Sequence, residues 1–169
     1  TRWNNQDAAP WVFEIRRGVK FHDGRPLRAA DVVWSFERLA GAGKGLEMSG
    51  HVSMLRRVRA TGERTVEVVT TGPVGVLPNK LRFIMIVPEG EDVAGLSRRV
   101  VGTGPFRLES WEKGRSLTLR RNESYWGARP SLAEVRISLN RAPAEALGDL
   151  LSGRSDFVQS SSKGTEEAI

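Results

Sequence analysis

Histidine, cysteine and serine carry much of the metal-binding and nucleophilic chemistry of proteins, and this sequence offers them in few usable patterns. It has no cysteine, and its two histidines are His22, which precedes Asp23, and the distant His51. No His-x-His or His-Glu-x-x-His spacing is present, and no Gly-x-Ser-x-Gly turn presents a serine. We therefore expect no metal site, no cofactor and no catalytic residue. An enzyme centred on His22 and Asp23 is the weakest alternative, because His22 is better explained as a turn residue whose imidazole is satisfied locally.

A glycine-rich stretch, Gly102-Thr103-Gly104-Pro105, superficially resembles a phosphate-binding loop. It lacks the Gly-Lys-Ser/Thr ending of such loops, and Pro105 removes a backbone donor where a helix N-terminus would be needed. Two glycines followed by a proline suit a segment that crosses between two sheets or lobes. An ordinary turn before a strand explains the pattern equally well.

The charge of the 169-residue chain raises a nucleic-acid-binding alternative. The net charge is +6, and residues 1–85 carry 14 Lys/Arg against 8 Asp/Glu, whereas residues 86–169 carry 12 of each. The basic residues are scattered, and the densest group is Arg56-Arg57-Val58-Arg59. Scattered arginines favour a solvated surface over a phosphate-binding stripe.

Arg82 stands out because it adjoins the apolar run at residues 83–87. A guanidinium beside a buried strand must find a partner, either an internal carboxylate, which is favoured, or a ligand anion. The apolar run is also the longest in the chain and is far too short to cross a bilayer, which takes about 20 residues.

The first half of the sequence predicts a mixture of strands and helices. Residues 11–17 alternate Trp11, Phe13 and Ile15 with less apolar residues, as in a half-buried strand. The remaining expected elements are a turn at 21–26, a helix at 29–39, a flexible loop at 41–50, a short helix at 52–57, strands at 58–61 and 65–70, and a buried strand at 83–87.

The second half predicts a hairpin of strands at 106–111 and 117–121, another strand at 135–139 and a helix at 142–151 that stops before Gly153. Aromatic residues at strand or helix spacing are expected to be core, and Tyr125-Trp126 is expected to pack rather than to stack on a ligand. Because strands and helices do not alternate strictly, we expect an α/β or α+β fold with a mixed sheet.

Three ordered blocks resemble the signature of family 5 extracellular solute-binding proteins, the dipeptide, oligopeptide and nickel receptors of ABC importers. The first is WVFEIRRGVKFHDGRPL at residues 11–27 with ADVVWSFER at 30–38. The second is VGTGPF at 101–106, LRRN at 119–122, YWG at 125–127 and Pro130. The third and weakest comprises Ala146-Leu147, Ser152-Gly153 and Asp156.

The resemblance implies part of the type II periplasmic-binding-protein-like fold, with the first lobe and a family-specific subdomain present and the second lobe missing. Residues 1–100 would form the subdomain, and residues 101–169 a truncated return to the first lobe. It further implies a non-enzymatic subunit that lies in the periplasm or at the cell surface and delivers a solute to the permease subunits of an ABC transporter. We expect the export signal to lie outside this chain, and any contact with the membrane to be through a lipid anchor outside it.

The resemblance also implies roles for particular residues. Those that could reach the ligand are Arg82, Leu46, Glu47 and Met48. Those of the hinge or structural signature are Gly102, Thr103, Gly104, Pro105, His22, Asp23 and Gly24. The ligand itself stays open among a peptide, a metal chelate, a sugar and an opine, and binding to nucleic acid is not expected.

Overall fold

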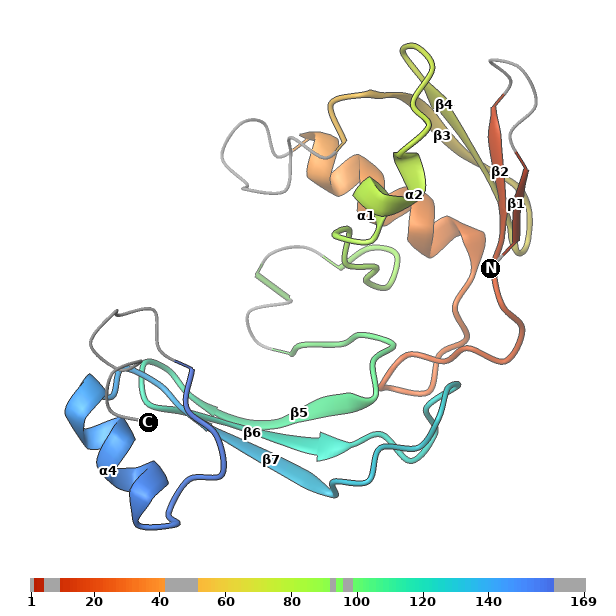
Figure 1. Ribbon diagram of the computed structural model, residues 1–169. Coiled ribbons are helices and arrows are strands. Elements are labelled where there is room, and N and C mark those ends of the chain that lie inside the picture. Colours follow the sequence, from red (N-terminus) through yellow and green to blue (C-terminus); the bar gives the residue numbers. More distant parts are fainter. Residues whose placement is uncertain (1, 5–9, 42–51, 92–93, 96–98, 160–169) are drawn as a thin grey trace. The chain divides into compact units, whose positions relative to one another are not determined.

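The computed structural model describes residues 2–4, 10–41, 52–91, 94–95 and 99–159, and the chain divides into two compact units (Figure 1). The first unit contains residues 1–107 and 120–133, and the second contains residues 108–119 and 134–169. Within the described residues, no helix is long and apolar enough to cross a membrane.

A four-stranded antiparallel sheet forms the centre of the first unit. Its strands are β1 (Arg2–Asn4), β2 (Trp11–Glu14), β3 (Leu55–Gly62) and β4 (Thr65–Thr70), in the order β1-β2-β4-β3. The β3–β4 hairpin has the expected turn between Gly62 and Thr65, and β4 pairs with β2 so that Val66 lies opposite Phe13. The strands expected at 65–70 and at the start of 11–17 are confirmed.

Helix α1 (Ala29–Gly41) packs against β3 and β4. It buries Ala29, Ser35, Phe36 and Leu39, which share one face at helical spacing, while Glu37 on the opposite face is exposed. The helix expected at 29–39 is therefore confirmed. A short helix, α2 (Leu77–Leu81), follows the sheet, and its first residue, Leu77, is fully buried.

The core of the first unit contains two adjoining clusters of buried side chains. The larger consists of Trp11, Ile15, Ala29, Val66, Val68 and Leu77, and the smaller of Phe36, Leu39, Val52 and Ile84. The alternation of residues 11–15 has placed Trp11 and Ile15 in the core, while Val12 between them remains 39% exposed on the other face of the sheet.

Two expected elements are wrong. Residues 52–54 form a turn and Leu55 already begins β3, so no helix occupies 52–57. Residues 83–87 do not form a strand. The run is also not uniformly buried, since Ile84 and Val87 are buried whereas Phe83 is 38% and Met85 70% exposed. The backbone of Val87 bonds to the Ser35 side chain instead of to a neighbouring strand.

A three-stranded sheet follows, composed of β5 (Phe106–Glu112), β6 (Ser116–Arg121) and β7 (Glu134–Ser138) in that order. The boundary between the units falls inside β5 and β6. Helix α4 (Pro143–Leu151) ends just before Gly153, whose φ of 71° lies in the left-handed region. The hairpin, the third strand and the final helix are confirmed, and so is the mixed helix-and-strand fold.

An ion-pair cluster on the outer face of the sheet gives a pH-dependent prediction. Hydrogen bonds from Arg59 hold the pKa of Glu67 below its usual range, against the raising effect of burial. A lowered folded-state pKa stabilises the protein above the unfolded-state pKa, and this contribution is lost as the pH falls through the folded-state value. We therefore expect Arg59→Gln to reduce the drop in Tm between about pH 7 and about pH 3.

The matched control for this measurement is Arg56→Gln, which removes a guanidinium from the same strand without breaking the Glu67 hydrogen bonds. Thermal melts at a series of pH values should show a smaller acid-induced drop in Tm for Arg59→Gln but not for Arg56→Gln. An equal change in both variants would mean that net charge, and not the Glu67 pair, sets the acid dependence.

Candidate functional site

The first and second signature blocks meet at one hydrogen-bonded joint, which consists of His22, the 102–105 segment, Asn122 and Trp126. All of these residues belong to the first unit. The contacts join positions 80 and 82 residues apart in the chain. The resemblance in sequence therefore corresponds to a single place in the fold.

A tight turn presents His22 to the joint. The Gly24 N–H donates to the carbonyl of Phe21 at 2.9 Å, and Gly24 has a φ of 90°, which suits glycine. Phe21 is 2% exposed and anchors the turn in the interior, while Lys20 and Pro26 form a β-bridge across its base. The expected turn is present, and Gly24 supplies its residue of positive φ.

Three hydrogen bonds connect His22 to the glycine-rich segment. Its backbone N–H donates to the Gly102 carbonyl at 2.8 Å, and its Nδ1 atom lies 3.2 Å from the Gly102 nitrogen. Its Nε2 atom lies 3.1 Å from the Gly104 carbonyl oxygen. The expectation that the imidazole is satisfied within its own turn is therefore wrong, since its partners lie in the second block.

Asn122 and Trp126 also form hydrogen bonds to this segment. The Asn122 side chain donates to the Gly104 carbonyl at 3.1 Å, and its backbone N–H donates to the Pro105 carbonyl at 2.8 Å. The Trp126 indole donates to the Thr103 carbonyl at 3.0 Å, and the Arg16 guanidinium lies over its ring. The sequence predicted only that Trp126 packs together with Tyr125, and it assigned no role to Asn122, although both residues lie in the second block.

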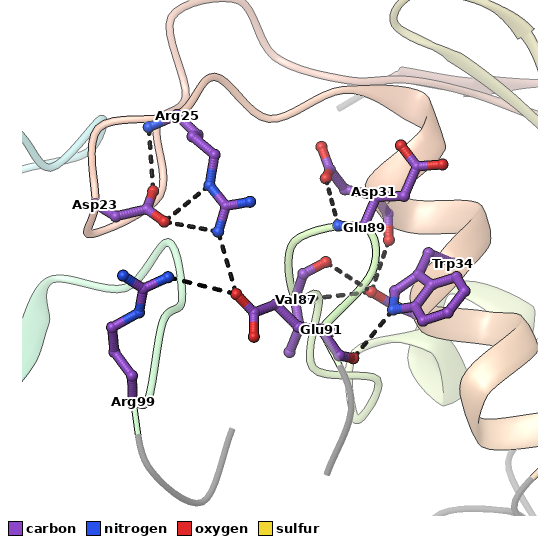
Figure 2. Close-up of polar contacts among 9 residues, drawn as sticks. Asp23, Arg25, Asp31, Trp34, Val87, Glu89, Glu91 and Arg99 are labelled. Atoms are coloured by element: carbon purple, nitrogen blue, oxygen red, sulfur yellow. Dashed lines mark hydrogen bonds and ion pairs between the residues drawn. The ribbon is translucent and has the colours of Figure 1, made fainter. Parts of the chain in front are cut away.

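A charged cluster lies beside the His22 turn (Figure 2). Arg25 forms ion pairs with Asp23 at 2.7 Å and with Glu91 at 3.3 Å, and Arg99 lies 3.5 Å from the same Glu91 oxygen. Burial raises the pKa of Asp23, but hydrogen bonds from Arg25 outweigh burial and hold that pKa below its usual range. The Asp23 carboxylate is thus paired with Arg25, which argues against an enzyme centred on His22 and Asp23.

Two side chains of α1 hold the segment at residues 87–91 (Figure 2). Asp31 accepts hydrogen bonds from the backbone N–H groups of Arg28 at 2.7 Å and Glu89 at 2.8 Å. The Ser35 hydroxyl accepts from the Val87 N–H at 3.0 Å. Asp31 therefore caps its own helix and anchors a distant loop at once.

Of the four predicted ligand-contact residues, the structure describes only Arg82. Arg82 is exposed, and its guanidinium lies 4.6 Å from the centre of the Phe83 ring. Among the described residues it forms no ion pair, so the favoured internal carboxylate is not found there. Leu46, Glu47 and Met48 lie outside the described residues.

A metal centre is not found in the described part of the chain. No group of three His, Cys, Asp or Glu side chains could hold a metal ion there. An open groove of about 290 Å³ lies between α1 and β3, and none of the predicted site residues lines it.

The sequence and the structure match known proteins over most of the chain. The family model of bacterial extracellular solute-binding proteins, family 5 (middle), matches residues 1–169, so the chain belongs to this family. A relative is the probable D,D-dipeptide-binding periplasmic protein DdpA of Escherichia coli, 31% identical over 80% of this chain and 28% of its own length. The oligopeptide-binding protein AppA of Bacillus subtilis is 28% identical over 85% of this chain and 28% of its own length.

Solved structures of the family share the fold. MoaA of A. tumefaciens, in complex with mannopinic acid, is 31% identical with a TM-score of 0.83, over 92% of this chain and 33% of its own. NikZ of Campylobacter jejuni, in complex with Ni(L-His), is 21% identical with a TM-score of 0.81, over 90% of this chain and 32% of its own. The chain thus spans about a third or less of the length of these relatives.

The nucleic-acid-binding alternative gains no support. No relative described above is named for nucleic acid, and Arg57 and Arg59 of the densest basic group both pair with Glu67. Arg141 and Arg154 similarly share Asp149. Arginines that gather around carboxylates do not form a stripe that could follow a phosphate backbone.

Proposed function

We propose that this chain is part of the solute-binding subunit of an ABC importer, which captures a small solute outside the cytoplasm and delivers it to the permease subunits. The match of the family model to every residue of the chain carries the proposal. The relatives are named for dipeptide and oligopeptide binding or were solved with mannopinic acid or Ni(L-His), so a peptide or a similar small polar solute is the ligand class. Capture proceeds by closure of two lobes and involves no catalysis.

The same proposal assigns a structural role to each of two parts of the chain. Residues 1–100 form the subdomain that distinguishes the family, and residues 101–169 return the chain to the first lobe. Gly102, Thr103, Gly104 and Pro105 then form a crossing segment. The hydrogen bonds that hold Gly102 at one end of this segment and Pro105 at the other support that role, because a crossing segment must be fixed at defined points for the lobes to close reproducibly.

Thermal denaturation of the full-length protein against pooled solutes tests the function. Pools of peptides, sugars, opines and nickel chelates are compared with a DNA duplex. A solute present at 100 times its Kd should stabilise the folded protein by about 2.7 kcal/mol, which is a measurable rise in Tm. A rise with one small-solute pool supports the proposal, whereas a salt-sensitive rise with the duplex alone would contradict it.

Arg82 is the described residue that we propose to contact the solute, together with Leu46, Glu47 and Met48. A charge-assisted hydrogen bond contributes about 1.5–3 kcal/mol, so Arg82→Ala in the full-length protein should weaken solute binding by about 10- to 100-fold. Lys80→Ala, which removes a cation from the adjacent helix α2, is the matched control and should change the Kd by less than about twofold.

Calorimetric titration with the solute identified by the thermal screen gives both dissociation constants, and circular dichroism checks that each variant is folded. Equal affinities for the Arg82→Ala and Lys80→Ala variants would remove Arg82 from the binding site. They would leave the solute-binding function itself standing, because the screen tests that separately.

A further inference from the structure

The hydrogen bonds of the His22 ring allow only one protonation state. The Gly102 backbone N–H can only donate, so the Nδ1 atom that faces it at 3.2 Å must carry a free lone pair. The Gly104 carbonyl can only accept, so the Nε2 atom that faces it at 3.1 Å must carry the hydrogen. The joint therefore selects the neutral imidazole protonated at Nε2.

A proton added to this ring has no acceptor in the joint. It would bind at Nδ1 and place an N–H against the Gly102 N–H, which removes one hydrogen bond and sets two donors face to face. The bond from Nε2 to Gly104 would persist, and Asn122 also donates to that carbonyl. The bond from the His22 backbone N–H to the Gly102 carbonyl at 2.8 Å would also persist, so the loss is confined to the Gly102 N–H.

The charged groups around the joint offer an added positive charge little compensation. On the His22 turn and the segments that contact it, they are the carboxylates of Asp23 and Glu91 and the guanidiniums of Arg25 and Arg99. On the segment of Asn122 and Trp126 they are the Glu123 carboxylate, which pairs with Arg121 and Arg129, and Arg16 lies over the Trp126 ring. All three carboxylates are already paired with arginine, so none is free to stabilise an added positive charge in this arrangement.

We propose that His22 is a proton-sensitive latch: the neutral ring holds the Gly102 N–H and the Gly104 carbonyl, and acidification frees the Gly102 N–H. The inference concerns the joint itself and goes beyond solute capture. It gives a protein exposed to the pH of its surroundings a way to loosen one fixed point of the fold in acid. An unpaired Gly102 N–H would favour arrangements of the segment in which water or another acceptor takes its hydrogen bond.

Amide hydrogen exchange in the deuterated, ¹⁵N-labelled full-length protein tests the latch without any solute. The protection factor of the Gly102 amide, corrected for the intrinsic pH dependence of exchange, should fall by at least about tenfold between about pH 8 and about pH 4. The Asn122 amide, which bonds to the Pro105 carbonyl, is the internal control and should keep its protection. The imidazole ¹⁵N shifts of His22 at the higher pH should report the Nε2-protonated form.

Two variants complete the test. His22→Gln replaces the ring with a side chain that can accept and donate but takes up no proton, so protection of Gly102 should no longer depend on pH. His51→Gln removes the other imidazole and should behave like the wild type. The Nδ1-protonated tautomer at the higher pH, constant protection of Gly102 in the wild type, or an equal fall in His22→Gln would each overturn the latch. Because no solute is present, any of these results leaves the proposed function untouched.

Discussion

Replacement of Trp11 by alanine should lower the free energy of unfolding by about 3–5 kcal/mol, the usual cost of removing a buried aromatic side chain. Trp11 is 5% exposed and packs in the larger core cluster with Val66, Val68 and Leu77. Its ring also stacks on that of Phe13, with centroids 6.2 Å apart. The substitution would leave a cavity between the sheet and the elements that cover it.

The neighbouring residue provides the control. Val12 is 39% exposed and lies on the other face of β2, so Val12→Ala in the same strand should cost less than about 1 kcal/mol. Urea denaturation followed by circular dichroism measures both variants. A similar loss of unfolding free energy in Trp11→Ala and Val12→Ala would mean that β2 does not have one inward and one outward face.

Asp31→Ala should lower the free energy of unfolding by about 2–4 kcal/mol, because two backbone N–H groups, those of Arg28 and Glu89, lose their acceptor. Asp31 is 8% exposed, so water replaces the carboxylate poorly. Asp31→Asn retains one acceptor oxygen and should lose about half as much. The effect is large for one polar side chain since it joins the start of α1 to a segment 58 residues away.

Amide exchange separates this anchoring role from a general loss of stability. The Glu89 amide should exchange faster in Asp31→Ala than in a core variant of equal stability. Glu37→Ala, which removes an exposed carboxylate from the same helix, should change the unfolding free energy by less than about 0.5 kcal/mol. Unchanged exchange at Glu89 in Asp31→Ala would show that the hydrogen bond at 2.8 Å does not hold the loop in solution.

The elements that the sequence predicted well are those that patterns of neighbouring residues determine. The alternation of residues 11–15 needs only one buried face, and the β3–β4 hairpin needs only its turn residues and a β-branched strand. The helix α1 was visible in the spacing of its apolar residues and α4 in the glycine that follows it. In each case the signal lies within about a dozen residues.

The elements that the sequence predicted badly depend on distant partners. The apolar run at 83–87 is typical of a buried strand, yet Ser35, 52 residues earlier, takes the hydrogen bonds of Val87 that a strand would have used. The expected helix at 52–57 is replaced by a strand, because Leu55 pairs with Thr70 of β4. Local propensity cannot reveal either pairing.

The joint was only half visible in the sequence. The resemblance marked His22 and the 102–105 segment as parts of one signature, but nothing in the spacing showed that the imidazole spans from one to the other. Asn122 completes the joint and is 8% exposed, and a buried asparagine cannot be distinguished from a surface one in a single sequence.

Small-angle X-ray scattering of the full-length protein, with and without the solute found by the thermal screen, tests the central claim most directly. Capture by lobe closure requires that the solute favours a more compact state. We expect the radius of gyration to decrease on addition of the solute and to remain unchanged with a non-binding solute of the same class. A solute that raises the Tm but leaves the radius of gyration unchanged would contradict capture by lobe closure.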